Sequence, residues 1–202
     1  VAAFFPALER AAPQARRCAL SAGVLFKLPF VRELALATGC VDAGRHAANQ
    51  CLERGLSLSV VPGGEREQLL AQRGPVERSV LRERKGFVRL ALRHGVPVVP
   101  VYCFGEAQLY RQSQFLFGLR AWVQRSFGVA VVLPYGPCGL PFVHFPEKLS
   151  LVVGAPVEML RIAEPSKDDV DKHHARYIVE LEQMFARHKD AAGYGHVRLE
   201  LI

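Results

Sequence analysis

Hydrophobic residues recur in this chain with two periods, one typical of helices and one typical of buried strands. From Phe87 to His94 they recur at helical spacing, and the following Gly95 suits the left-handed residue that ends a helix. The next residues form an apolar, β-branched run with the length of a buried strand. We therefore expect a helix over residues 80–94 and a strand over residues 96–104.

The same patterns predict further elements on both sides of this segment. The final helix is expected to begin at Ser166, whose hydroxyl can cap it, with Asp168 and Asp169 in its first turn. Strands that alternate with helices predict an α/β fold with a mostly parallel central sheet flanked by helices. The remaining expected strands are 17–22, 56–61 and 150–153, the remaining helices are 30–38, 44–54 and 118–127, and the final helix carries the apolar stripe Val170, His174, Tyr177, Leu181, Met184 and His188.

Composition favours a single domain over residues 1–202. Half of the residues are hydrophobic and 22% are charged, which argues against disorder. The five cysteines are an odd number at unrelated spacings, so we expect reduced, mostly buried thiols and neither a disulfide framework nor a metal site. The apolar run at residues 24–30 is interrupted by Lys27 and Pro29, and no uninterrupted stretch has membrane-span length.

The net charge of +7 suits binding to one of three anionic partners: nucleic acid, a lipid surface or the phosphates of a coenzyme. We expect no nucleic acid, because the basic residues form no single run and no base-reading motif is present. One basic cluster is either a solvated helical face paired with Glu77 and Glu83, or a phosphate-binding surface. Its members are Arg78, Arg82, Arg84, Lys85, Arg89 and Arg93.

Two expected strands are followed by residues that could take part in chemistry. Gly63 and Gly64 could present backbone N–H groups to an anion, or they form an ordinary tight turn. Glu67 could orient a base or bind a substrate hydroxyl, or it is an acid in the first turn of a helix. Glu106 follows a buried strand directly, where sites of open α/β sheets form, although it could also cap the next helix.

The segment from Arg84 to Glu106 resembles the central block of the type-2 diacylglycerol acyltransferase family, which includes monoacylglycerol acyltransferases and wax synthases. The similarity extends over almost the whole chain, through residues 5–6, 28–33, 60–67, 152–157 and 168–189. The resemblance implies a glycerolipid-acyltransferase-like fold and acyl transfer from acyl-CoA to diacylglycerol, giving triacylglycerol at the cytosolic face of the endoplasmic reticulum membrane. Acyl-CoA is then a substrate, and no cofactor is expected. The implied substrate-binding residues are Gly63, Gly64, Arg84 and Lys85, with Glu106 and Glu67 as supporting catalytic candidates.

One departure from the family is important for the chemistry. The His-Pro-His-Gly motif, which supplies the presumed catalytic histidine, is absent, and none of the seven histidines lies in such a motif. We expect the motif histidine upstream of Val1, so that this chain is an N-terminally incomplete fragment, inactive alone. The alternative is a non-catalytic lipid-surface module that has lost the histidine. Monoacylglycerol and long-chain alcohols are alternative acceptors, and a nucleotide-binding protein that uses the Gly63-Gly64 loop is a weaker hypothesis, because the fingerprint lacks its third glycine.

Residues 110–127 combine large apolar side chains with arginines around Trp122. This composition is typical of a helix at a membrane interface, with aromatic rings at headgroup depth and cations toward phosphate. The alternative is an ordinary amphipathic helix packed on the sheet. The histidines have simpler interpretations: His94 favourably meets a helix C-terminus, and His174 is expected to pack on the stripe of the final helix.

Overall fold

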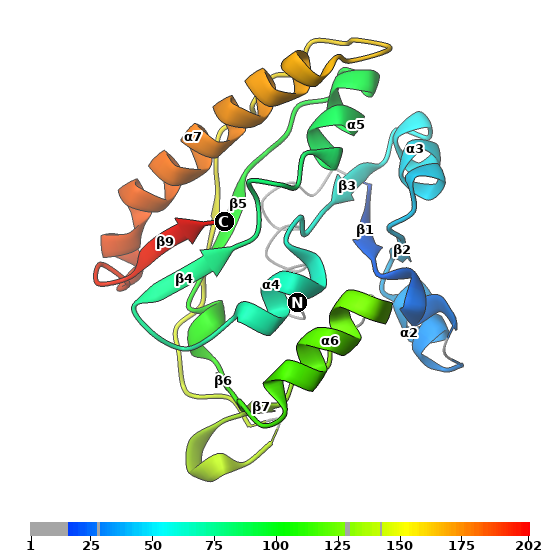
Figure 1. Ribbon diagram of the computed structural model, residues 1–202. Helices are drawn as coiled ribbons and strands as arrows, with labels where there is room; N and C mark the ends of the chain where they lie inside the picture. Colours follow the sequence, from blue (N-terminus) through cyan, green and yellow to red (C-terminus); the bar gives the residue numbers. More distant parts are fainter. Residues whose placement is uncertain (1–15, 28, 128–129, 142) are drawn as a thin grey trace.

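The computed structural model describes residues 16–27, 29–127, 130–141 and 143–202. Phe5, Pro6 and Leu28, which contribute to the family resemblance, lie outside these residues. The described chain is a mixed α/β structure in which helix α7 (Lys167–Ala192) runs along one side (Figure 1). Helix α2 (Val31–Ala37) lies on the opposite side in the same view.

The first part of the chain forms a small parallel sheet. Strand β1 (Arg17–Ser21) lies between β2 (Cys40–Asp42) and β3 (Ser57–Ser59), and both pairings are parallel. The 3-10 helix η1 (Gly23–Lys27) and α2 connect β1 to β2, and α3 (Arg45–Glu53) connects β2 to β3. Gly39 and Gly55 follow α2 and α3 with φ of +74° and +71°, the left-handed conformation in which a glycine commonly ends a helix.

The main core lies between α7 and α5 (Gly86–His94). The predicted capping of α7 is confirmed, because the Ser166 hydroxyl accepts from the Asp169 N–H and the Asp169 carboxylate accepts from the Ser166 N–H. The stripe of α7 is buried as expected except at its end, where Phe185 is buried and His188 is exposed. The His188 ring instead folds back onto its own helix, toward the Met184 carbonyl oxygen.

Two strand pairs extend this core. Strand β4 (Val76–Ser79) pairs in parallel with β9 (Arg198–Leu201), the last strand of the chain. Strand β5 (Val101–Phe104) pairs with β8 (Ser150–Val153) in antiparallel orientation. The predicted mixed α/β class is confirmed, whereas one mostly parallel central sheet is not observed, since the described strands form separate small sheets.

The two central elements are shorter than the sequence predicts. The helix expected over residues 80–94 begins only at Gly86, because Val80 and Leu81 are buried in the connection that precedes it. The N–H of Leu81 in this connection donates to the carbonyl oxygen of Ile202, the last residue of the chain. The strand expected over residues 96–104 begins only at Val101. Pro97 and Pro100 lack the N–H groups that a strand ladder needs, and the first half of the run makes one isolated bridge to residue 157.

Residues 105–149 form an excursion between β5 and β8, here called the β5–β8 excursion. Its main element is α6 (Phe117–Phe127), which confirms the predicted helix; the others are η2 (Glu106–Gln108), β6 (Arg111–Gln112), β7 (Pro134–Tyr135) and η3 (Pro137–Gly139). Strands β6 and β7 pair in antiparallel orientation. Buried Arg120 donates to the carbonyl oxygens of Ser113 and Val131 and so ties α6 to both flanking loops.

Two further expectations concern membranes and thiols. No helix in the described ranges is both long and apolar enough to cross a bilayer. All five cysteines are free thiols, but only Cys18 and Cys51 are buried, so the expectation of mostly buried thiols is only partly met. Burial, together with the neighbouring Cys51, raises the pKa of the Cys18 thiol to about 12, which keeps it protonated.

Candidate functional site

The predicted glycine loop forms a tight turn at the start of helix α4 (Gly64–Leu70). Gly64 has a φ of +55°, a conformation that favours glycine. A Cβ at Gly63 would collide with the carboxylate of Glu67, so the close approach of that side chain also requires glycine. The glycine pair therefore has a structural explanation whether or not its N–H groups face a substrate.

Glu67 holds helix α4 against the residues that follow β4. Its Oε2 accepts a 2.6 Å hydrogen bond from the Ser79 hydroxyl and a 2.8 Å hydrogen bond from the Val80 N–H. Glu67 also lies in the first turn of α4, as one of the two interpretations proposed. Because this oxygen already has two donors within the protein, Glu67 positions the connection between β4 and α5.

Residues 80–85 connect β4 to α5 and carry the two predicted phosphate ligands. Arg84 is exposed, and Lys85 forms a 2.7 Å ion pair with Asp171 of α7. The hydrogen bond from Lys85 lowers the pKa of the Asp171 carboxyl. Glu83 pairs at 3.3 Å with Arg66 of α4. The connection is therefore fastened to α4 on one side and to α7 on the other, with Arg84 left at the surface.

One of the two interpretations of the basic cluster included pairing with Glu77, and this pairing is not observed. Glu77 is only 9% exposed, and its carboxylate accepts a hydrogen bond from the Tyr102 hydroxyl. Arg78, the adjacent member of the cluster, instead pairs with Glu200 across the β4–β9 ladder at 2.9 Å. The alternation of the strand β4 turns Glu77 inward and Arg78 outward, whereas the expected pairing required both side chains at the surface.

Glu77 belongs to a buried polar cluster that the sequence does not predict. Gln108 Nε2 donates to the Gly74 carbonyl oxygen at 2.8 Å and lies 3.5 Å from Glu77 Oε1. Burial raises the pKa of Glu77, and the nearby charge of Glu106 raises it further. Burial and the charge of Glu77 also raise the pKa of Tyr102. The sequence contained one signal, an acid in an alternating strand segment, but no way to place its partners.

Glu106 lies at the carboxyl end of β5, as predicted, and is exposed. Gly105, with a φ of +90°, is the N-cap of η2, and Glu106 is its first residue. The Glu106 side chain makes no hydrogen bond to the described residues. The Glu106 charge instead acts on its neighbours, since it raises the pKa of Cys103 after the larger effect of burial. Its placement is consistent with a group that acts on a bound molecule.

A hollow of about 370 Å³ opens beside the buried cluster. On its wall, Arg73 pairs with Glu147 at 2.6 Å and stacks over Phe145, and Tyr194 donates to the Lys148 carbonyl oxygen at 2.8 Å. It is lined by Arg73, Gln108, Glu147, Lys148, Ala192, Gly193, Tyr194 and His196. Within the described ranges, no group of three or more His, Cys, Asp and Glu side chains is arranged to hold a metal ion.

The histidines have structural partners. His174 is buried, as expected for the stripe of α7, and its Nε2 donates to the Leu81 carbonyl oxygen at 3.1 Å. Burial lowers the pKa of His174, so the ring is neutral at ordinary pH. His94 Nε2 bonds to Asn49 Oδ1 at 2.8 Å and so joins α5 to α3.

The predicted site residues thus fall into two groups. Gly63, Glu67 and Lys85 lie around the connection between β4 and α5, where Arg84 also lies. Glu106 lies beside the buried Glu77 at the end of β5. In the described part of the chain, no hydrogen bond or ion pair joins the two groups.

The model of one protein family, diacylglycerol acyltransferase, matches residues 8–201 of this chain. The chain belongs to this family. The diacylglycerol O-acyltransferase 2 of Bos taurus is 34% identical over 183 residues, which cover 83% of this chain and 50% of the relative. The acyl-CoA wax alcohol acyltransferase 2 of Homo sapiens is 34% identical over 198 residues, or 91% of this chain and 59% of the relative.

A third relative is similar over a comparable share of the chain. The diacylglycerol O-acyltransferase 1 of Eremothecium gossypii is 30% identical over 188 residues, which cover 88% of this chain and 41% of the relative. The chain spans about half the length of the curated relatives that it matches. No solved structure matches it significantly. The family predicted from the segment 84–106 is therefore confirmed.

Proposed function

We propose that this chain is part of an acyl-CoA-dependent O-acyltransferase that forms triacylglycerol from diacylglycerol. The observation that carries the proposal is the family match over residues 8–201, almost the whole chain. In the reaction, the acceptor hydroxyl oxygen attacks the thioester carbonyl carbon, the hydroxyl proton passes to a base, and the coenzyme thiol leaves as the ester forms. The acyl group is neither oxidised nor reduced, so the reaction needs no redox cofactor.

Within this proposal, the described residues bind and position the substrates. The exposed Arg84 contacts a phosphate of acyl-CoA, while Lys85 is held in place by Asp171 and supports it. Glu106 stabilises charge or orients the base beside the reacting groups, because it is exposed and unbonded at the end of β5. The motif histidine of the family, which residues 1–202 lack, would supply the base.

A chimera tests this function directly. Residues 8–201 replace the matching half of the Bos taurus relative, and triacylglycerol formation from labelled acyl-CoA and diacylglycerol is measured in membranes. We expect activity well above that of a chimera whose motif histidine is replaced by alanine. An inactive but folded chimera would favour the non-catalytic lipid-surface module. Formation of wax ester from a long-chain alcohol, in preference to triacylglycerol, would favour the acceptor class named for the human relative.

The same chimera tests Glu106. Glu106→Gln preserves the shape of the side chain and removes its charge, so kcat should fall while KM for acyl-CoA changes little. Unchanged turnover per folded molecule would remove Glu106 from the site. We expect residues 1–202 alone to form no triacylglycerol above a control without protein, because they carry no His-Pro-His-Gly motif.

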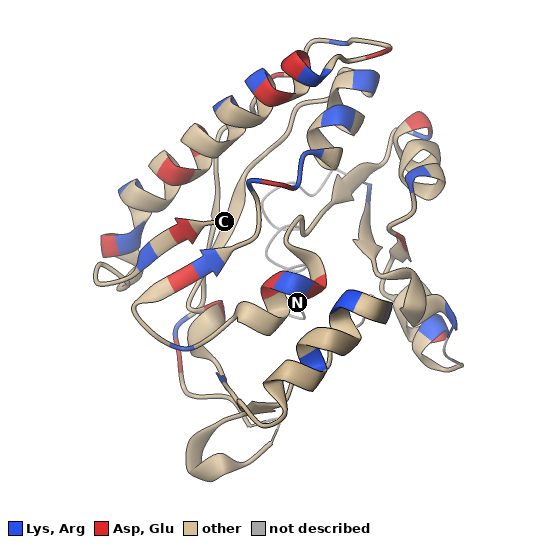
Figure 2. Cartoon of the chain, viewed as in Figure 1, with Lys and Arg blue, Asp and Glu red and all other residues tan. Residues whose placement is uncertain are grey.

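We also propose that the β5–β8 excursion contacts the membrane that contains the lipid substrates, on the cytosolic face of the endoplasmic reticulum. Residues 107–146 contain no Asp or Glu, and two of their three arginines, Arg111 and Arg125, are exposed, whereas Arg120 is buried. Figure 2 draws α6 without acidic residues. Exposed apolar side chains gather in this segment: Phe115, Leu116, Leu119, Trp122, Leu140 and Val143. Apolar and cationic groups without acids suit the interface of an anionic bilayer.

A further inference from the structure

A second outward-facing apolar surface lies at the start of α2. Phe30, the N-cap of this helix, is 89% exposed, and Leu34, one turn further, is 67% exposed. The Leu34 N–H donates to the Phe30 carbonyl oxygen at 3.1 Å, so the first turn of the helix carries two large apolar side chains that face solvent. Leu36 of the same helix is also exposed, whereas Ala35 is its one buried residue. Most apolar side chains of α2 therefore do not contribute to the core.

The backbone at Phe30 is strained. Its φ of +65° lies in the left-handed region, which is costly for a large non-glycine residue. The exposed ring has little packing to offset this cost. Leu116 is in the same situation, with a φ of +49° and an exposed side chain directly before α6. Two exposed helices of the described chain thus begin with a strained residue that turns a large apolar side chain toward solvent.

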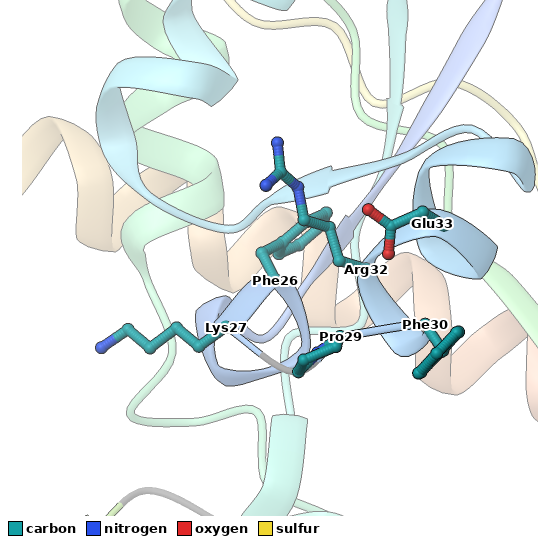
Figure 3. A pocket seen from close by; sticks show the side chains of 6 residues that line it. All are labelled: Phe26, Lys27, Pro29, Phe30, Arg32 and Glu33. Carbon is teal, nitrogen blue, oxygen red and sulfur yellow. The ribbon is translucent and has the colours of Figure 1, made fainter.

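Cations accompany the apolar side chains. Lys27 and Arg32 line an open hollow of about 440 Å³ together with Phe26, Pro29, Phe30 and Glu33. Figure 3 shows the side chains of Lys27, Arg32 and Phe30 pointing in three different directions, Lys27 from η1 and Arg32 from α2. In the described residues, neither cation forms an ion pair with a carboxylate. An exposed ring and an exposed leucine beside two cations match a surface that has apolar chains below a layer of phosphates.

We propose that Lys27, Phe30, Arg32 and Leu34 form a second contact with an anionic phospholipid bilayer, in which Phe30 and Leu34 enter the acyl-chain boundary and the two cations approach lipid phosphates. This contact, the η1–α2 contact, is additional to the one proposed for the β5–β8 excursion. The helices of the two contacts, α2 and α6, lie on the side opposite α7 in Figure 1. Two contacts, unlike one, fix the orientation of the protein on the membrane and keep α7 away from it.

A tryptophan at position 30 tests the contact directly. Trp122 is the only tryptophan, so the variant Trp122→Phe, Phe30→Trp of the full chain reports on position 30 alone. Vesicles of phosphatidylcholine and phosphatidylserine, with and without brominated acyl chains, are the probe. We expect a blue shift of the emission and quenching by the brominated lipid. A folded variant that binds the vesicles but shows neither change overturns the η1–α2 contact and leaves the proposal for the excursion intact.

Loss of binding provides the complementary test. Phe30→Ser with Leu34→Ser should weaken partition into the same vesicles on the order of tenfold or more, because two inserted side chains are lost. Leu160→Ser with Val179→Ser is the matched control, since both residues are exposed and lie elsewhere, and it should bind like the wild type. Equal binding by the two double variants would contradict the contact.

Two further measurements test the role of the cations and the possibility of self-association. Lys27→Gln and Arg32→Gln should each weaken binding about fivefold, and only for vesicles that contain phosphatidylserine. Analytical ultracentrifugation of the wild type and of the Phe30→Ser, Leu34→Ser variant shows whether the surface joins two copies instead. A dimer that dissociates in this variant, with unchanged vesicle partition, overturns the proposal in favour of self-association.

Discussion

Leucines are buried in the core around α5 and α7, whereas most of those in the β5–β8 excursion are exposed. Leu92 of α5 is 0% exposed in the main core, whereas Leu119 of α6 is 53% exposed. The acids differ as well: α7 carries many Asp and Glu residues on its outer face, and α6 carries none. A helix that shows charges of both signs to water suits an aqueous surface. A helix that shows apolar and cationic groups suits a lipid interface, which supports the membrane contact proposed for the excursion.

The largest expected effect is the difference in stability between a leucine-to-alanine substitution in α5 and one in α6. Leu92→Ala should lower the free energy of unfolding by about 2–5 kcal/mol, because it leaves a cavity in the core. Leu119→Ala removes the same atoms from an exposed site and should change it by less than about 0.5 kcal/mol. Urea denaturation of both variants measures the difference. Equal losses would mean that α6 is packed as tightly as α5.

Two carboxylates, Glu67 and Glu106, should differ in the same way in their contribution to stability. Glu67→Ala removes the acceptor for Ser79 and Val80 and should cost about 1–3 kcal/mol of stability. Glu106→Ala, at the start of the excursion, removes an exposed group with no side-chain hydrogen bond and should be nearly neutral. Thermal or urea unfolding distinguishes them. A neutral Glu67→Ala variant would show that its hydrogen bonds do not hold α4 in place.

The basic residues before α5 should affect binding more than stability. In the active chimera, Arg84→Gln with Lys85→Gln should raise the KM for acyl-CoA on the order of tenfold, with kcat little changed, because ground-state charge contacts are lost. Arg78→Gln is the control, since Arg78 pairs with Glu200 at the surface. If both variants raise the KM equally, the effect is a general loss of positive charge and not a site.

A smaller, pH-dependent effect is expected from the buried Glu77. Burial raises its pKa in the folded state above the ordinary 4.5, so the folded protein keeps a proton that the unfolded chain releases. The stability that this proton contributes is present below 4.5 and is lost as the pH rises through the folded pKa. Glu77→Gln, which has no such titration, should therefore gain stability relative to the wild type with rising pH. Parallel melting curves of the two proteins that keep the same offset at every pH would contradict the raised pKa.

Local sequence signals predicted helix boundaries where a single residue sets them. Gly95 and Ser166 act through their own backbone and hydroxyl, and both mark the observed helix boundaries. Val80 and Leu81 have a pattern compatible with a helix, yet their burial in a connection depends on the last strand of the chain, over a hundred residues away. Such long-range pairings are absent from periodicity, so β4 and β9 were not predicted.

The candidate site follows the same rule. The positions of Gly63 and Glu106 at the ends of strands were predictable, because they follow from strand length and turn residues. The partners of Glu67 and Glu77 were not, since they come from segments that meet only in the folded chain. The exposure of Phe30 was also hidden, because the sequence shows an ordinary apolar residue and only the backbone reveals its outward direction.

The emission of Trp122 tests most directly whether the β5–β8 excursion faces lipid. The wild-type chain needs no substitution, because this tryptophan is its only one and lies on the exposed face of α6. We expect a blue shift on addition of anionic vesicles at low salt, and its loss in high salt or with neutral vesicles, since screening weakens the attraction of the arginines. An unchanged spectrum with anionic vesicles at low salt would contradict the proposed contact.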